Sequence, residues 1–154
     1  MKRRRIRHPD YRNPVAAAIL RAGIRRQVLE LKTAADLQAW DGANAARLVN
    51  SAGRMVFVVA HAATACGVGA DEPDSRIVRG MADAVGDLAA DGDMERHRPA
   101  IQAGLLAIDR LLPRCNDWAL GLGAQELERL LASTAGMGTA DIHAIFYPQQ
   151  ETTP

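Results

Sequence analysis

The sequence predicts an all-α protein: a compact bundle of about five helices with a basic N-terminal arm and an irregular C-terminal tail. The chain has 154 residues, the length of one domain. Hydrophobic residues make up 48% of it and aromatic residues only 4%. A β-sandwich would need more aromatic and β-branched residues, whereas abundant alanine favours helix. Apolar residues at helical spacing then locate each element.

The first helix is expected over residues 14–31. Asn13-Pro14 offers an N-cap residue followed by proline at the first helical position, and the basic arm of residues 1–13 precedes it. Thr33 is expected to cap the next helix. The inward stripe of this first helix comprises Ala17, Leu20, Ile24, Gln27, Val28 and Leu31.

The segment 34–64 carries the most apolar stretch of the chain. Asp41-Gly42 is a point at which this helical segment can divide in two. The stretch 55–59 (MVFVV) is also compatible with a buried strand, but the alanine-rich flanks continue the helical period, so helix is favoured. A fully apolar circumference predicts a central, buried helix. Its main face comprises Leu37, Trp40, Ala45, Leu48, Ala52, Met55, Val59 and Ala62.

Three further helices are expected over 74–90, 95–112 and 124–133. A glycine-containing loop over 66–73 precedes the first of them, and the segment 91–93 (DGD) ends it. Pro113 ends the second, and the segment 120–123 (LGLG) is interpreted as a turn before the third. The helical domain therefore spans 14–135, and residues 136–154 form the tail. The inward residues are Ile77, Met81, Val85, Leu88, Ile101, Leu105, Ile108, Leu112, Leu127, Leu130 and Leu131.

Charge is distributed unevenly along the chain. Residues 1–32 hold ten Lys/Arg and two acids, for +8, while the remaining residues sum to −7. Within 71–95 there are eight acids against two arginines. This asymmetry indicates a charged partner surface or head-to-tail contact between copies.

Candidate binding residues follow from this distribution. The basic arm is compatible with a solvated tail, with contacts to nucleic-acid phosphates, and with an acidic protein partner. The basic set is Arg3, Arg4, Arg5, Arg7 and Arg12 in the arm, continued by Arg21 and Arg25 on the first helix. The acidic set is Asp83, Asp87 and Asp91.

No catalytic, cofactor or metal signature is recognised. The segment 121–123 lacks the third glycine of a dinucleotide fingerprint, and the calcium-loop-like spacing at 91–95 has glycine at the wrong place. The histidines are scattered, and Cys66 and Cys115 are expected to be buried thiols in a reducing compartment. No secretory signal or membrane span is recognised, so the expected location is the cytoplasm.

The opening segment 7–16 (RHPDYRNPVA) resembles the start of small uncharacterised α-helical proteins of phages, plasmids and integrated elements of GC-rich proteobacteria. The similarity covers residues 7–24 and carries over no functional residue. It implies a mobile-element context, in which small proteins act by binding host machinery, as anti-CRISPR proteins do.

The expected function is therefore a non-enzymatic protein-binding module that inhibits a host nucleoprotein complex, of anti-CRISPR type. The alternative is a small nucleic-acid-binding regulator that uses the basic arm and the first helix. No cofactor is expected. A homodimer through the apolar 55–65 segment stays open.

Overall fold

The computed structural model describes residues 14–36 and 42–134, and within them it contains helices and no strand. The all-α prediction is thereby confirmed. The helices are α1 (Pro14–Asp36), α2 (Gly42–Ala65), α3 (Pro73–Asp91), α4 (Met94–Leu111), the short 3-10 helix η1 (Leu112–Arg114) and α5 (Asp117–Ser133). Residues 1–13 and 136–154, predicted as arm and tail, lie outside the described residues.

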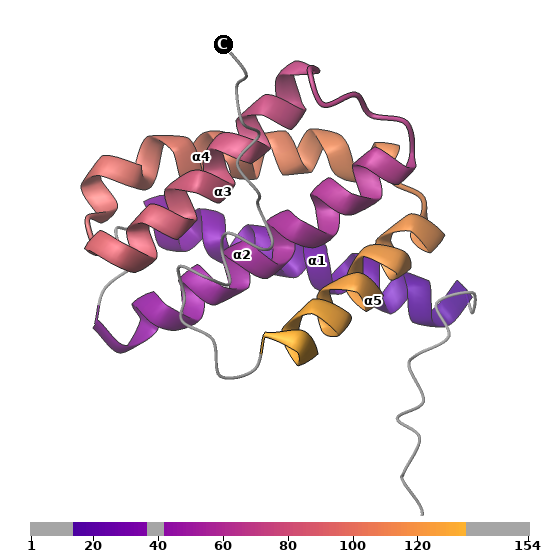
Figure 1. Ribbon diagram of the computed structural model, residues 1–154, viewed down its shortest axis with the longest axis horizontal. Helices are drawn as coiled ribbons and strands as arrows, with labels where there is room; N and C mark the ends of the chain where they lie inside the picture. The colour runs from indigo at the N-terminus through magenta and orange to yellow at the C-terminus, as the bar shows by residue number, and fades with distance from the viewer. Residues whose placement is uncertain (1–13, 37–41, 135–154) are drawn as a thin grey trace, which may run out of the picture.

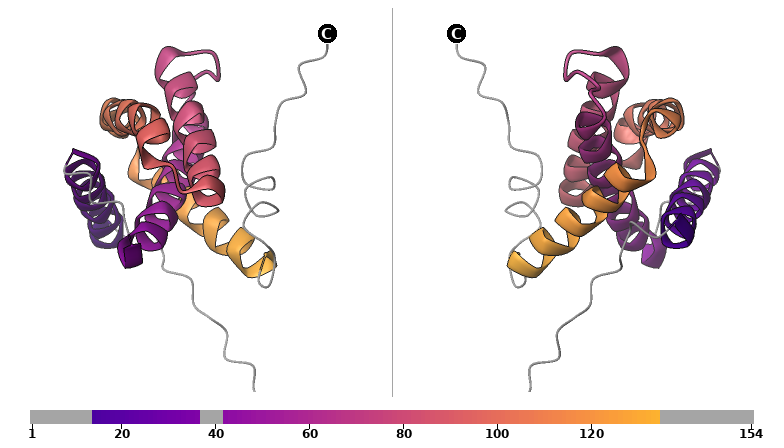
Figure 2. Two further views of the ribbon diagram at one scale, coloured as in Figure 1. Left: turned by 90° about the vertical axis from the view of Figure 1, so that its left-hand side faces the viewer. Right: turned by 90° about the vertical axis from the view of Figure 1, so that its right-hand side faces the viewer.

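The helix α2 runs through the middle of the molecule and packs against all four other α-helices (Figure 1). The most extensive helix pair is α3 with α4, which are joined by a tight turn at Gly92. The helix α1 packs on α4 and α5. In the turned views α1 lies on the outer side, and α5 begins near it and crosses α2 obliquely (Figure 2).

The central position of α2 follows from its sequence. Every residue of the stretch 55–59 is buried, from 9% exposed at Phe57 to fully buried at Val59. Five consecutive residues cover more than one turn, so the whole circumference of the helix faces protein. This confirms helix over the strand alternative. These side chains are buried within one copy, so they are covered by the other helices of the same chain.

The end of the first helix differs from its prediction. The helix α1 continues to Asp36 instead of ending at residue 31. Thr33 lies inside it and donates its hydroxyl to the Leu29 carbonyl, so the prediction that Thr33 caps the next helix is wrong. Gln27 is exposed, because it lies at the edge of the apolar stripe. The predicted break at Asp41-Gly42 agrees with α2 beginning at Gly42.

The predicted turn over 120–123 is wrong. The helix α5 begins at Asp117, where the Asn116 side chain accepts a hydrogen bond from the Ala119 amide at 2.8 Å, and it continues through both glycines. A Cβ on Gly123 would lie 2.7 Å from the Val58 carbonyl oxygen. Gly123 therefore allows the backbones of α5 and α2 to touch. Packing of this kind outweighs the low helix propensity of glycine.

The contact between α5 and α2 predicts a contrast between two glycine substitutions. Gly123→Ala should lower the free energy of unfolding by about 1–3 kcal/mol, because the added methyl meets rigid backbone. Gly23→Ala on α1 meets nothing within 4 Å, and it should raise that free energy by about 0.5–1 kcal/mol. Urea denaturation of both variants measures this contrast. Equal effects would contradict the close contact.

Candidate functional site

The predicted basic residues fall into three situations. The arginines of the arm lie outside the described residues: Arg3, Arg4, Arg5, Arg7 and Arg12. Arg21 and Arg25 both lie on α1, four residues apart, but their surroundings differ.

Arg21 is a structural contact between distant parts of the chain. Its Nε donates to Asp117 Oδ1 at 2.7 Å, and its two terminal nitrogens donate to the carbonyls of Leu112 at 3.1 Å and Cys115 at 2.5 Å. Its side chain is only 20% exposed. The guanidinium thus joins α1 to the end of α4 and the start of α5. Because the Arg21 guanidinium is bonded to these groups of the same chain, it is not available to bind a partner.

The outward face of α1 is different in character. Val15, Ile19 and Leu29 are 65%, 68% and 66% exposed, although they are large and apolar. Together with Ala22 and Arg26 they follow a spacing of four and three residues along one side of the helix. We call these five residues the α1 face.

Sequence reasoning missed the α1 face because it assigned the apolar residues of this helix to one inward stripe. The signal that could have found it is the second apolar series at helical spacing, on the opposite side. Arg25, which was predicted, and Arg26 are both exposed, and neither makes an ion pair with a described acid. The exposed apolar side chains are therefore accompanied by two available positive charges.

An exposed tryptophan lies close to α1. Trp118 follows Asp117 in the first turn of α5, and its side chain is 54% exposed. The bond between Arg21 and Asp117 holds this turn of α5 beside α1. Tryptophan and arginine are enriched among the residues that dominate binding energy in protein interfaces.

The three predicted acidic residues also differ in their contacts. Asp83 is half-buried and Asp87 is exposed on α3, and neither makes an ion pair with a described residue. Asp91 instead closes the turn between α3 and α4. His97 Nε2 lies 2.7 Å from its Oδ2, and the Asp93 amide donates to its Oδ1 at 2.8 Å.

The contacts of Asp91 alter its titration. The hydrogen bond from His97, and then that from the Asp93 amide, lower the pKa of the Asp91 carboxyl. Both bonds stabilise its ionised form within the turn. The Asp91 carboxylate is therefore bonded within the turn. Of the three predicted acidic residues, only Asp83 and Asp87 remain available to bind a partner.

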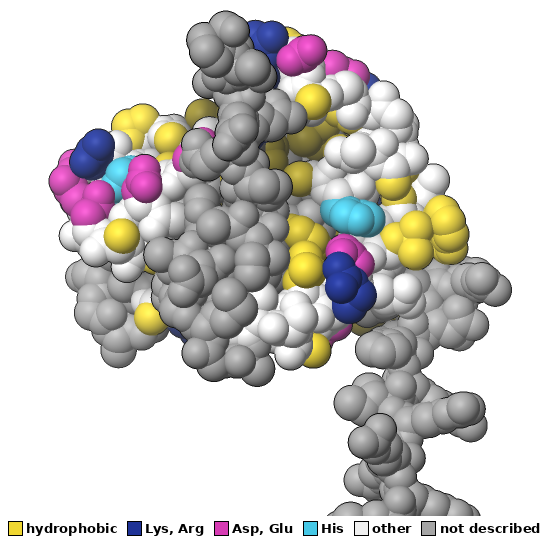
Figure 3. Space-filling model, in the orientation of Figure 1, with side chains coloured by type: hydrophobic (Ala, Val, Ile, Leu, Met, Phe, Trp, Pro, Cys, Tyr) yellow, Lys and Arg dark blue, Asp and Glu magenta, His cyan; other side chains and the backbone are white. Residues whose placement is uncertain are grey.

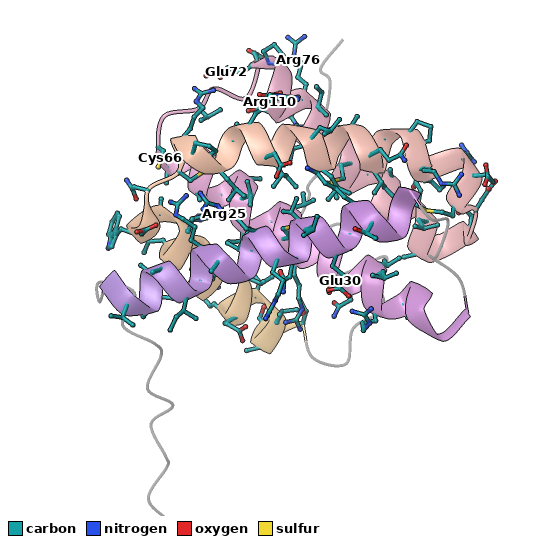
Figure 4. All side chains as sticks on the ribbon, turned by 180° about the vertical axis from the view of Figure 1, so that it is seen from behind. Arg25, Glu30, Cys66, Glu72, Arg76 and Arg110 are labelled. Carbon is teal, nitrogen blue, oxygen red and sulfur yellow. The ribbon has the colours of Figure 1, made fainter. Side chains whose placement is uncertain are left out.

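Part of the acidic excess in 71–95 is neutralised by arginines, two of which, Arg110 and Arg114, lie elsewhere in the chain. Figure 3 shows basic and acidic side chains next to each other in small groups, and Figure 4 shows Glu72, Arg76 and Arg110 gathered at one end of the molecule. The bond from Arg114, followed by that from the Gly69 amide, lowers the pKa of Glu72. The ion pairs are Arg76 with Asp71 at 3.8 Å, Arg110 with Asp74 at 2.7 Å and Arg114 with Glu72 at 2.6 Å.

The two cysteines are free and differ in exposure. Cys115 is buried, as expected, whereas Cys66 is only half-buried and accepts a 3.5 Å hydrogen bond from the Asn116 amide. Burial raises the pKa of the Cys115 thiol to about 11. This keeps Cys115 in its unreactive, protonated form.

His61 is a half-buried polar residue of α2. It packs against Phe57 with ring centroids 6.1 Å apart, and its Nδ1 is buried without a hydrogen-bond partner. Among residues 14–36 and 42–134, no group of three or more His, Cys, Asp or Glu side chains is placed to hold a metal ion.

Comparison of the chain with protein-family models, with curated proteins and with solved structures finds no match. Within the part of the chain that the structure describes, no helix is long and apolar enough to cross a membrane. The assignment of a function therefore depends on the surfaces of the molecule.

The contacts of Arg21 predict that it supports the fold, whereas Arg25 does not. Arg21→Met keeps the aliphatic stem but leaves two carbonyls and Asp117 without their donor, so it should lower the free energy of unfolding by about 1–3 kcal/mol. Arg25→Met should change it by less than about 0.5 kcal/mol. Chemical denaturation measures both values. A similar small effect for both variants would show that the Arg21 contacts do not stabilise the fold.

The two thiols should react at different rates with a thiol reagent at pH 8. With a pKa of about 11, Cys115 is ionised to roughly one part in a thousand. It is also buried, so the folded protein should react mainly at Cys66, and Cys115 should react only after unfolding. Mass spectrometry of the Cys66→Ser variant tests this: rapid labelling of the folded variant would contradict the burial of Cys115.

Proposed function

We propose that this chain is a non-enzymatic protein-binding module that inhibits a host nucleoprotein complex, in the manner of anti-CRISPR proteins of mobile elements. The observation that carries the proposal is the α1 face, with Val15, Ile19 and Leu29 each about two-thirds exposed. A single exposed apolar residue is ordinary, but several on one line along a helix are typical of an interaction site. The resemblance of residues 7–16 supplies the mobile-element context.

The chemistry of the α1 face indicates what its partner must offer. An apolar strip would cover Val15, Ile19 and Leu29, and acidic side chains beside that strip would pair with Arg25 and Arg26. Trp118, in the turn of α5 that Arg21 joins to α1, is a further exposed aromatic side chain. An acidic groove or helix on a protein combines these features, whereas a phosphate backbone offers the charge without the apolar contact.

The acidic pair on α3 supports inhibition of a complex that handles nucleic acid. Such a complex carries Lys and Arg side chains where it binds phosphates. Asp83 and Asp87 make no ion pair with a described residue. Once the α1 face has docked, their carboxylates would form ion pairs with those Lys and Arg side chains of the partner. Inhibition would then arise from competition with the nucleic acid.

The decisive experiment is affinity capture from a host lysate with the tagged chain, with and without nuclease. The natural chain should retain a nuclease-resistant protein complex, and the activity of that complex on its nucleic acid should fall when the chain is added. Ile19→Asp places a charge inside the α1 face and should reduce capture at least about tenfold, as loss of a central contact does. Leu106→Asp on α4 is the matched control, since Leu106 is also exposed and apolar but lies outside the face.

The outcomes separate this proposal from the alternative. Capture that is lost equally in both variants, or in neither, would contradict docking through the α1 face. Capture that disappears with nuclease would favour the nucleic-acid-binding regulator, for which the unpaired Arg25 and Arg26 are the supporting observation. In that case the affinity for duplex DNA should fall steeply with salt.

A further inference from the structure

A cavity of about 150 Å³ lies between α2 and α3, away from the α1 face. Its floor consists of buried apolar side chains, among them Val56 from α2, Val78 from α3 and Leu111 from α4. Its rim carries the polar residues Ser75 and Arg79, of which Arg79 is exposed. The cavity therefore has an apolar interior and a polar opening.

The size of the cavity limits what it can hold. Alanines at 60, 63 and 82 line it, and they leave room that larger side chains would fill. Apolar cavities of this volume accept a group about as large as benzene, and they are smaller than the pockets of drug-sized ligands. One branched or aromatic group fits this space, and a larger molecule would extend past the rim.

The rim carries one positive charge, that of Arg79, which is outside the ion pairs at this end of the molecule. The acids at this end of the molecule, Asp71, Glu72 and Asp74, are each paired with an arginine other than Arg79. Arg79 makes no ion pair with a described acid, although Asp83 follows it by one helical turn. Its guanidinium is thus available to an anion at the opening.

The first turn of α3 adds donors at the same opening. Ser75 lies in this turn, and the N-cap residue Glu72 makes no side-chain capping bond because its carboxylate binds Gly69 and Arg114 instead. The amides of a first helical turn have no partner within the helix and favour negative charge. A carboxylate placed between Ser75 and Arg79 would receive both the hydroxyl and the guanidinium.

From this arrangement we propose that the cavity binds a branched or aromatic apolar group joined to a carboxylate. The apolar group occupies the floor, and the carboxylate binds Arg79 and Ser75 at the rim. Two kinds of molecule offer this chemistry: a small free carboxylic acid, and the C-terminal residue of a peptide that ends in leucine or phenylalanine. The site is independent of the proposed docking through the α1 face.

The test is titration of the full chain with isocaproate, followed by NMR of its methyl groups. Isocaproate should shift the methyl signals of Val56, Val78 and Leu111, with a dissociation constant in the millimolar range that so small a ligand allows. Isocaproamide, which has the same shape without the charge, should bind at least about fivefold more weakly. No shift of these methyls, or equal binding of acid and amide, would overturn the proposal.

Two variants on α3 locate the carboxylate. Arg79→Gln should weaken isocaproate binding at least about fivefold, whereas Arg76→Gln should change it less than about twofold, because Arg76 does not line the cavity. Both side chains are exposed, so neither change should affect folding. Equal weakening by the two variants would show that only the general positive potential attracts the acid, which contradicts the assigned site.

A third variant fills the cavity, and a peptide identifies the source of the ligand. Ala60→Leu, at the half-buried edge, should abolish binding. A short peptide ending in leucine is then compared with its C-terminal amide. If the peptide with a free C-terminus shifts the same methyl signals and its C-terminal amide does not, the site binds peptide C-termini. If only isocaproate shifts these signals, the ligand is a small carboxylic acid.

Discussion

The burial of α2 is the constraint on which the rest of the structure depends. Because every side of the stretch 55–59 is apolar, this helix is stable only when other helices surround it. The other four α-helices form that cover, and each keeps one side for solvent. At Gly123 the cover approaches α2 so closely that the Val58 carbonyl leaves no room for a methyl group. Function must therefore be sought on the outer helix surfaces and between the covering helices.

The periodicity of the sequence was sufficient to predict the helices, but not which helices pack against each other. It predicted helix for 55–59, because apolar spacing is a local property. It also predicted part of the buried stripe of α3 and α4, including Met81 and Ile101, but not Val78 or Leu111. It misread the glycines of α5 as a turn, since what a glycine touches depends on another helix. The same limit applies to charge: Asp117, the partner of Arg21, is 96 positions away. No local pattern distinguishes Arg21, which is bonded inside the fold, from Arg25, which is available.

The arrangement of charge in space differs from its arrangement along the chain. Arginines from the end of α4 and from η1 neutralise Asp74 and Glu72, so the acidic stretch is weaker in the folded molecule than in a residue count. What remains available on α3 is the pair Asp83 and Asp87, together with Arg79 at the rim of the cavity. Folding thus reduces a broad charge asymmetry to a few specific positions, which are the ones able to distinguish among partners.

The tight turn at Gly92, where the backbone adopts a φ of 68°, has a consequence for the order of assembly. It joins the two helices with the most extensive contact, so they meet after closing a very short loop, which costs little chain entropy. By contrast, α1 gains its partners on α4 and α5 only after most of the chain exists. During synthesis from the N-terminus, α1 is therefore made long before its α4 and α5 neighbours. The arginines interspersed among its apolar residues oppose premature association over that interval.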